Sequence, residues 1–200
     1  MPANKRTNYH HGALRDALLA SAEKILKKEG LQALTLRAIA REAKVSHAAP
    51  AHHFRDLTDL LSELAASGFE RMSASMEAEC AKKPDPRSAA HAYVAFAVAH
   101  PALFQLMFRG EKLDNQSTTL RAARDRALRS LAGAKAPAAS TEMTLDRVGQ
   151  MTAGWSLVHG FAMLLIDGPL NAMFRLAPQG TDTMALLDAA LNAVNVGRSK

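Results

Sequence analysis

The 200-residue sequence contains few cysteines and aromatic residues, and each shortage narrows the class of protein. Because Cys80 is the single cysteine, no disulfide can form within the chain, and we expect a reducing compartment. Aromatic residues make up 5% of the chain and long β-branched runs are missing, so the core must consist mainly of aliphatic side chains and alanine. This composition predicts an all-α protein.

Long apolar stretches are missing as well. No segment approaches the length that is needed to span a bilayer. The first residues, MPANKRTNYHHG, contain no apolar run of the kind that signal peptides have. We therefore expect a cytoplasmic protein that has no membrane partner.

Positive charge is concentrated in the first third of the chain. The net charge is +6, and residues 1–60 hold ten Lys or Arg against six Asp or Glu, which is four of that net six. Five of the eight histidines also lie there. A basic balance suits an anionic partner, although it does not distinguish nucleic acid from a membrane surface or an acidic ligand.

Hydrophobic spacing and helix breakers predict the elements and their boundaries. Residues 1–10 are polar and basic, which predicts a flexible arm. Apolar residues recur at helical spacing over 11–29, and Gly30 ends that helix. The segment KKPDPR, residues 82–87, is a strong breaker. Further helices are predicted at 36–43, 46–53, 57–81, 88–99, 102–108, 118–132, 142–166 and 181–196.

Two short helices surround a tight turn between Thr35 and Phe54. Thr35 is a suitable N-cap for the first of them and Ser46 for the second. This is the geometry of a helix-turn-helix, whose second helix enters the major groove of DNA. The spacing alone equally allows two ordinary amphipathic helices.

The residues of this region favour the first interpretation. The stretch NYHHGALRDALLASAEKILKKEGLQALTLRAIAREAKVSHAAPAHHF resembles the DNA-binding domain of the TetR family of transcriptional regulators, over about residues 8–64. The likeness rests on the glycine that ends the first helix, the LTLRAIAREA run, the VS pair and the final HF. It implies a repressor that binds a palindromic operator as a dimer and releases it on binding a small effector. It also implies a DNA-binding domain at 11–56 and a ligand-binding and dimerisation domain at 57–200, with 57–81 as the linking helix.

The resemblance assigns DNA contacts residue by residue. Thr35 and Arg37 match positions that touch phosphate or nearby bases, and a helix N-terminus offers free N–H groups to phosphate. His47 has the side chain best suited to reading base edges, and the neighbouring alanines suit thymine methyl groups. The predicted DNA-binding residues are Lys5, Arg6, Thr35, Arg37, Lys44, Ser46, His47, Ala48, Ala49, His52, His53 and Arg55.

Two positions depart from the family pattern. TetR-like proteins usually carry a tyrosine where this chain has Ala51, and a lysine where it has Leu57. Both family residues commonly reach the DNA backbone, and Arg55 is a candidate replacement for the lysine. Because phosphate contacts supply much of the affinity, we expect moderate, salt-sensitive binding that depends on the arm residues Lys5 and Arg6.

The crowded histidines do not predict a metal site. His52 and His53 are neighbours and point about 100° apart on a helix, and His47 is poorly aligned with either of them. No cysteine or carboxylate completes a ligand set, so we expect neither a metal nor a cofactor. Pro50 falls at the fourth position of the predicted helix, where it removes one hydrogen bond and leaves the helix intact.

A second marked stretch, GWSLVHG, lies at residues 154–160. Trp155 and His159 share one helical face, and the spacing alone favours a plain core anchor over an apolar pocket with a polar handle. The W-x-x-x-H-G pattern, with HPALFQLMF upstream, is similar to the TetR C-terminal class called WHG, which implies effector binding and dimerisation. The predicted residues around a small apolar effector are Tyr93, Phe96, His100, Phe104, Met107, Met151, Trp155 and His159.

The same helix predicts a subunit interface on another face. Small residues there let a second helix approach closely, and the last helix adds an apolar stripe. The alternative is that both helices pack wholly inside one subunit. The predicted dimer residues are Gly149, Ala153, Ser156, Leu157, Gly160, Leu164, Leu187, Leu191 and Val194.

The sequence offers little support for an enzyme. An enzyme that uses His100 or His159 as a base is not expected, because neither has a nucleophile beside it. The sequence also has no G-x-S-x-G motif, no glycine-rich phosphate loop and no metal-ligand spacing. A constitutive dimeric DNA binder without an effector remains the main alternative.

Overall fold

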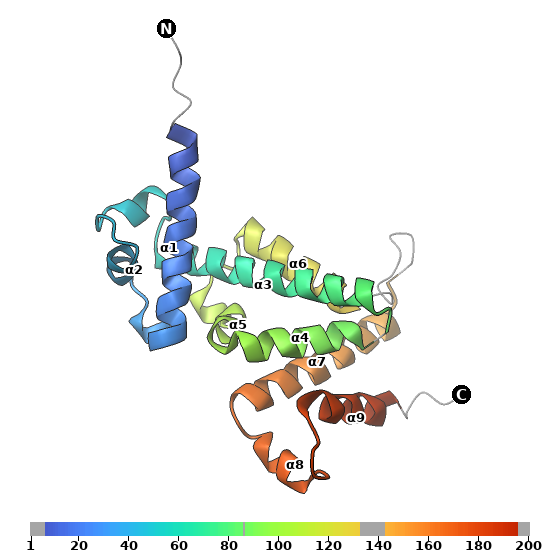
Figure 1. Ribbon diagram of the computed structural model, residues 1–200. Coiled ribbons are helices and arrows are strands. Elements are labelled where there is room, and N and C mark those ends of the chain that lie inside the picture. Colours follow the sequence, from blue (N-terminus) through green and yellow to red (C-terminus); the bar gives the residue numbers. More distant parts are fainter. Residues whose placement is uncertain (1–6, 86, 133–142, 196–200) are drawn as a thin grey trace. The chain divides into compact units, whose positions relative to one another are not determined.

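The computed structural model describes residues 7–85, 87–132 and 143–195, and these form helices and turns without a strand (Figure 1). The predicted all-α class is confirmed. The α-helices are α1 (Thr7–Glu29), α2 (Leu36–Glu42), α3 (Leu57–Lys82), α4 (Ser88–Ala99), α5 (Pro101–Met107), α6 (Thr118–Ala132), α7 (Leu145–Ile166), α8 (Asn171–Leu176) and α9 (Thr183–Asn195). Three short 3₁₀ helices are η1 (Leu31–Ala33), η2 (Ala49–His52) and η3 (Gly110–Lys112).

The chain forms two compact units. Unit 1 comprises Met1–Glu70 and His100–Asp125, and unit 2 comprises Arg71–Ala99 and Arg126–Lys200. Helices α3 and α6 each contribute residues to both units.

Unit 1 is built around α1, which packs against α2 and α5. The apolar spacing of α1 has the predicted result, because Leu18 and Ala22 are fully buried and Ile25 and Leu26 nearly so. Helix α5 lies close to α3 at Gly68, where an added β-carbon would stand 2.7 Å from Met107 Sδ. Glycine at this position therefore permits the close approach of the two helices.

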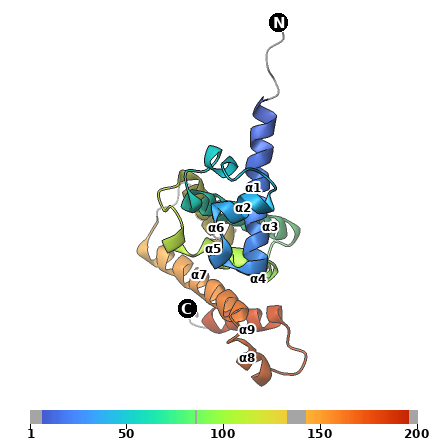
Figure 2. The same ribbon diagram turned by 90° about the vertical axis from the view of Figure 1, so that its left-hand side faces the viewer.

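Unit 2 is built on α7, against which α4 packs (Figure 1) and α9 packs (Figure 2). The inner face of α7 presents Val158, Phe161 and Ala162, which are buried. Polar contacts also join α4 and the residue before it to α9. Nε2 of His91 lies 2.8 Å from Asp188 Oδ1, and Arg87 Nη2 donates to Asn192 Oδ1 at 2.6 Å.

Several helices differ from the prediction. Helix α1 begins at Thr7 and not near His11, so part of the predicted arm is helical, and residues 1–6 lie outside the described residues. Helix α8, Asn171–Leu176, was not predicted. Its six residues lie between Pro169 and Pro178 and are too few to establish a helical period.

The second helix of the helix-turn-helix also differs, because it is a 3₁₀ helix and not an α-helix capped by Ser46. The Ser46 carbonyl accepts from Ala49 N at 3.0 Å, and the Ala48 carbonyl accepts from Ala51 N at 3.2 Å. Pro50 has no N–H and cannot make the α-helical bond back to Ser46. The prediction that proline leaves an α-helix intact is therefore wrong, and the chain closes tighter i to i+3 turns.

Candidate DNA interface and effector site

The turn of the helix-turn-helix is fixed by a side-chain cap at the start of α2 and a backbone hydrogen bond at its end. At its start, Thr35 Oγ1 accepts from Ala38 N at 3.1 Å, which is the predicted N-cap. At its end, Val45 N donates to the Ala40 carbonyl at 3.0 Å while Lys44 takes a left-handed conformation with φ 57°. This arrangement turns the chain sharply toward η2.

The inner side of the motif is anchored in the core of unit 1. Ile39 and Ala40 of α2 are fully buried, and Phe54, two residues after the end of η2, is 2% exposed. The Arg15 guanidinium lies 5.6 Å from the centroid of the Phe54 ring and donates to Glu63 Oε2 at 2.6 Å. Residues from α1 and α3 therefore hold the end of the motif in place.

Most of the predicted DNA-binding residues lie on the surface of unit 1. His53 is half-buried. The prediction for Ala49 is corrected, because this residue is 8% exposed and its methyl group is buried and cannot reach a base. Lys5 and Arg6 lie outside the described residues. The exposed members of the predicted set are Thr35, Arg37, Lys44, Ser46, His47, Ala48, His52 and Arg55.

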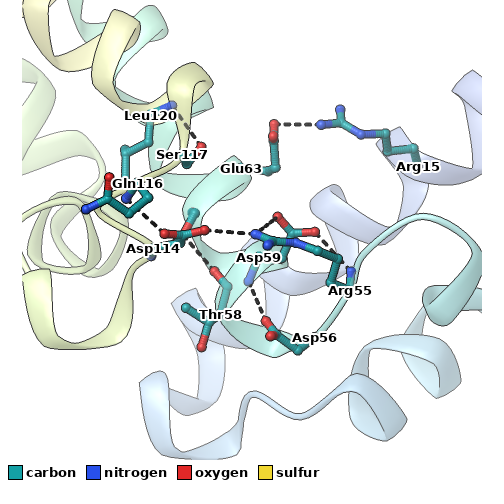
Figure 3. A network of polar contacts seen from close by, with 11 residues as sticks. Arg15, Arg55, Asp56, Thr58, Asp59, Glu63, Asp114, Gln116, Ser117 and Leu120 are labelled. Atoms are coloured by element: carbon teal, nitrogen blue, oxygen red, sulfur yellow. Dashed lines mark hydrogen bonds and ion pairs between the residues drawn. The ribbon is translucent and has the colours of Figure 1, made fainter.

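Arg55 is held by two carboxylates, as Figure 3 shows. Its Nη2 lies 2.8 Å from Asp114 Oδ2 and 3.4 Å from Asp59 Oδ1. The hydrogen bond from Arg55 is the main reason why the pKa of Asp114 is lowered, and Asp114 in turn raises the pKa of Arg55. The sequence did not predict Asp114, because 59 residues separate it from Arg55.

The marked tryptophan and histidine of α7 meet a buried tyrosine of α4 in unit 2. Tyr93 is 2% exposed, and its hydroxyl lies 2.9 Å from His159 Nδ1. Burial raises the pKa of Tyr93, which is opposed by a hydrogen bond from Trp155. The hydroxyl accepts that bond from the indole N–H, so its own hydrogen is available to His159.

The other predicted effector residues are distributed over both units. Phe96 of α4 is buried and Met151 of α7 is half-buried, both in unit 2. His100, Phe104 and Met107 belong to unit 1, where Phe104 and Met107 are fully buried. Within the predicted set, Tyr93, Trp155 and His159 contact one another directly.

Burial of His159 has a consequence for stability. Burial lowers the pKa of His159 below its ordinary value of 6.5. As the pH falls below about 6.5, the unfolded chain takes up this proton before the folded protein does, so folding loses stability. We expect the unfolding midpoint to fall on acidification, and less steeply in His159→Gln, which keeps a neutral acceptor for Tyr93. Urea titrations at several pH values measure both slopes, and parallel slopes would contradict this role.

The predicted dimer residues differ in how far they are exposed. Gly149, Ala153 and Ser156 are exposed on α7, and Leu164 is 48% exposed. The remaining described members are half-buried except Leu187, which is fully buried in unit 2 and is a correction. The side chain of Val194 lies outside the described residues. The half-buried members are Leu157, Gly160 and Leu191.

Two further properties concern the described residues only. They contain no helix with the length and apolar character to cross a bilayer. They also contain no group of three histidine, cysteine, aspartate or glutamate side chains placed to hold a metal ion.

Comparison with known proteins agrees with this architecture. Residues 18–64 match the family described as bacterial regulatory proteins, tetR family. Residues 87–194 match the tetracyclin repressor-like C-terminal domain. Among curated proteins, none matches this chain.

Solved structures share the fold over nearly the whole chain. A Rhodococcus sp. RHA1 protein of unknown function is 34% identical, with a TM-score of 0.74 over 98% of this chain and 100% of its own. The TetR-family regulator PfmR of Thermus thermophilus is 18% identical, with a TM-score of 0.56 over 92% and 99%. A TetR-family regulator of Marinobacter aquaeolei VT8 is 16% identical, with a TM-score of 0.58 over 93% and 95%.

A helix-turn-helix joined to a helical C-terminal domain defines a DNA-binding transcriptional regulator. The chain belongs to the TetR family, whose members are transcription factors and not enzymes.

Proposed function

We propose that the protein is a repressor that binds a palindromic operator as a dimer and releases it when a small apolar effector binds. The observation that carries the DNA-binding part is the two-sided helix-turn-helix. Ile39, Ala40 and Phe54 are buried, while Arg37 and His47 stand on the surface. Residues 11–56 are the proposed DNA-binding domain, and the protein would act in the cytoplasm, where the chromosome lies.

The proposed effector region is the part of residues 57–200 around Trp155. The indole is 40% exposed while its partner Tyr93 is buried, so an apolar ring reaches the surface beside a fixed polar group. An effector that contacts this ring can shift the operator equilibrium only if it binds the released conformation more tightly. The two recognition elements of a dimer must stand roughly 34–36 Å apart to occupy successive major grooves.

The alternative, a constitutive dimeric DNA binder, is supported by the same cluster. Both Trp155 and His159 form hydrogen bonds with Tyr93, so the buried hydroxyl is satisfied within the protein, as a purely structural role of this cluster requires. The two functions differ in whether any small molecule changes DNA binding.

Subunit pairing is proposed through the exposed face of α7. Gly149, Gly154 and Gly160 lie within this helix, and an added β-carbon at any of them would meet no atom within 4 Å. Each glycine costs about 1 kcal/mol of helix stability relative to alanine, and the described residues leave room for an alanine methyl group at each of them. Gly149 and Gly160 share a face with Ala153 and Ser156, which a helix of a second subunit can approach closely.

The experiment that tests the proposal is selection of genomic DNA fragments by the purified protein, with and without a panel of apolar metabolites. We expect enrichment of a palindromic sequence and its loss with one class of metabolite. Enrichment that no metabolite changes would favour the constitutive binder. Failure to enrich any sequence would contradict the DNA-binding function.

A further inference from the structure

Arg55 is a predicted phosphate contact directly after the helix-turn-helix, and its guanidinium forms ion pairs with two carboxylates. Asp59 and Asp114, here called the acidic clamp, both contact Nη2 of its guanidinium. The Arg55 side chain is 70% exposed, whereas each clamp carboxylate is 22% exposed. The arginine thus reaches the surface while its partners remain mostly covered.

Asp114 is placed firmly, and not by Arg55 alone. Its backbone N–H donates to Ser62 Oγ at 2.7 Å, and that fully buried hydroxyl donates to the Thr58 carbonyl at 2.7 Å. Its Oδ1 accepts from Gln116 N at 2.9 Å, which leaves Oδ2 for Arg55 (Figure 3). A carboxylate that is oriented in advance loses little entropy when it binds a guanidinium.

The charges in this group have a direct consequence for DNA binding. One arginine and two carboxylates sum to a formal charge of −1. A DNA phosphate that approaches Arg55 must compete with Asp114 for the same N–H groups and meets a net negative charge. The clamp therefore opposes the contact that Arg55 is suited to make.

We propose that Asp114 competes with DNA phosphate for Arg55, so that the acidic clamp is an autoinhibitory contact that lowers DNA affinity. This inference rests on the proposed DNA-binding function of the helix-turn-helix. It makes the short segment before α6 a negative regulator of DNA binding. Any change that draws Asp114 away from Arg55 strengthens binding.

The substitution Asp114→Asn tests the competition. The amide oxygen can still accept from Gln116 N, while the introduced NH₂ group faces Arg55 and ends the ion pair. Asp59→Asn is less suitable, because Asp59 Oδ2 also accepts from Arg55 N at the start of α3. The probe is a fluorescein-labelled duplex of random sequence, so no operator is needed.

We expect Asp114→Asn to bind this duplex more tightly than the parent chain, with the largest gain at low salt. Each added phosphate contact steepens the slope of log K against log salt by about 0.9, so the gain shrinks about 3.5-fold per contact between about 50 and 200 mM salt. The gain should vanish when Arg55→Ala is present in both chains. A gain that persists with Arg55→Ala, unchanged affinity or weaker binding would overturn the competition.

Asp85→Asn is the matched control. Asp85 Oδ1 accepts from Arg87 N at 2.8 Å, so this aspartate also caps a turn two residues ahead, and its substitution changes the net charge equally. An equal gain with Asp85→Asn would overturn the proposal. If Asp114→Asn fails to fold by circular dichroism, Asp114→Ser replaces it, because a hydroxyl can accept the same turn hydrogen bond. If the parent chain does not bind DNA at all, the proposed DNA-binding function is contradicted, and this result differs from every result that overturns the competition alone.

Discussion

Ala48→Glu is expected to weaken DNA binding strongly while leaving the fold unchanged. Ala48 is exposed at the start of η2, and its φ and ψ of −82° and −18° are open to any residue. A carboxylate on this surface would face the phosphates and the base edges of the groove. We expect affinity for a random-sequence duplex to fall at least about 100-fold, equivalent to about 2.7 kcal/mol.

A control variant distinguishes loss of the DNA-binding surface from an effect of net charge or of stability. Ala74→Glu carries the same change at an exposed position of α3 in unit 2 and should bind DNA nearly as the parent does. Both variants should unfold within about 0.5 kcal/mol of the parent, as is usual for surface substitutions. Fluorescence anisotropy measures the affinities. Equal binding by all three chains would show that η2 does not contact DNA.

The helix-turn-helix was predictable because its determinants are local. The cap at Thr35 and the buried spacing of Ile39 and Phe54 follow from residue types and short intervals. What local patterns did not give is the 3₁₀ form of η2. Near the start of an α-helix Pro50 would remove only one hydrogen bond, and this small loss does not predict another kind of helix. Residues 46–53 instead form i to i+3 hydrogen bonds.

The surroundings of the site were less predictable because they depend on distant pairs. The spacing of Trp155 and His159 placed them on one face, and Tyr93 was predicted beside them as an effector residue, but local spacing does not indicate that its hydroxyl forms hydrogen bonds with both side chains. The sequence likewise does not predict that Asp114 pairs with Arg55, because only the fold brings the segment before α6 close to the start of α3. Leu187 fitted an apolar stripe, and periodicity cannot say whether such a stripe faces its own core or a second subunit.

Ala153→Arg is expected to convert a dimer into a monomer. Ala153 is exposed and lies between Gly149 and Ser156 on the face where two copies of α7 are proposed to meet. A long charged side chain at a close helix contact prevents the approach and places two like charges together across the symmetry axis. Light scattering at micromolar concentration should give the mass of one chain for the variant and of two chains for the parent.

Loss of the dimer should also appear in the salt dependence of DNA binding. A monomer carries one helix-turn-helix and half the phosphate contacts, so the slope of log K against log salt should fall to about half that of the parent. Ala95→Arg, at an exposed position of α4, adds the same charge away from this face and should keep both the mass and the slope. If Ala153→Arg remains a dimer with an unchanged slope, the open face of α7 is not the subunit interface. The glycines within α7 would then require another explanation, since a β-carbon added at any of them would meet no atom within 4 Å in the described part of the chain outside the helix's own backbone.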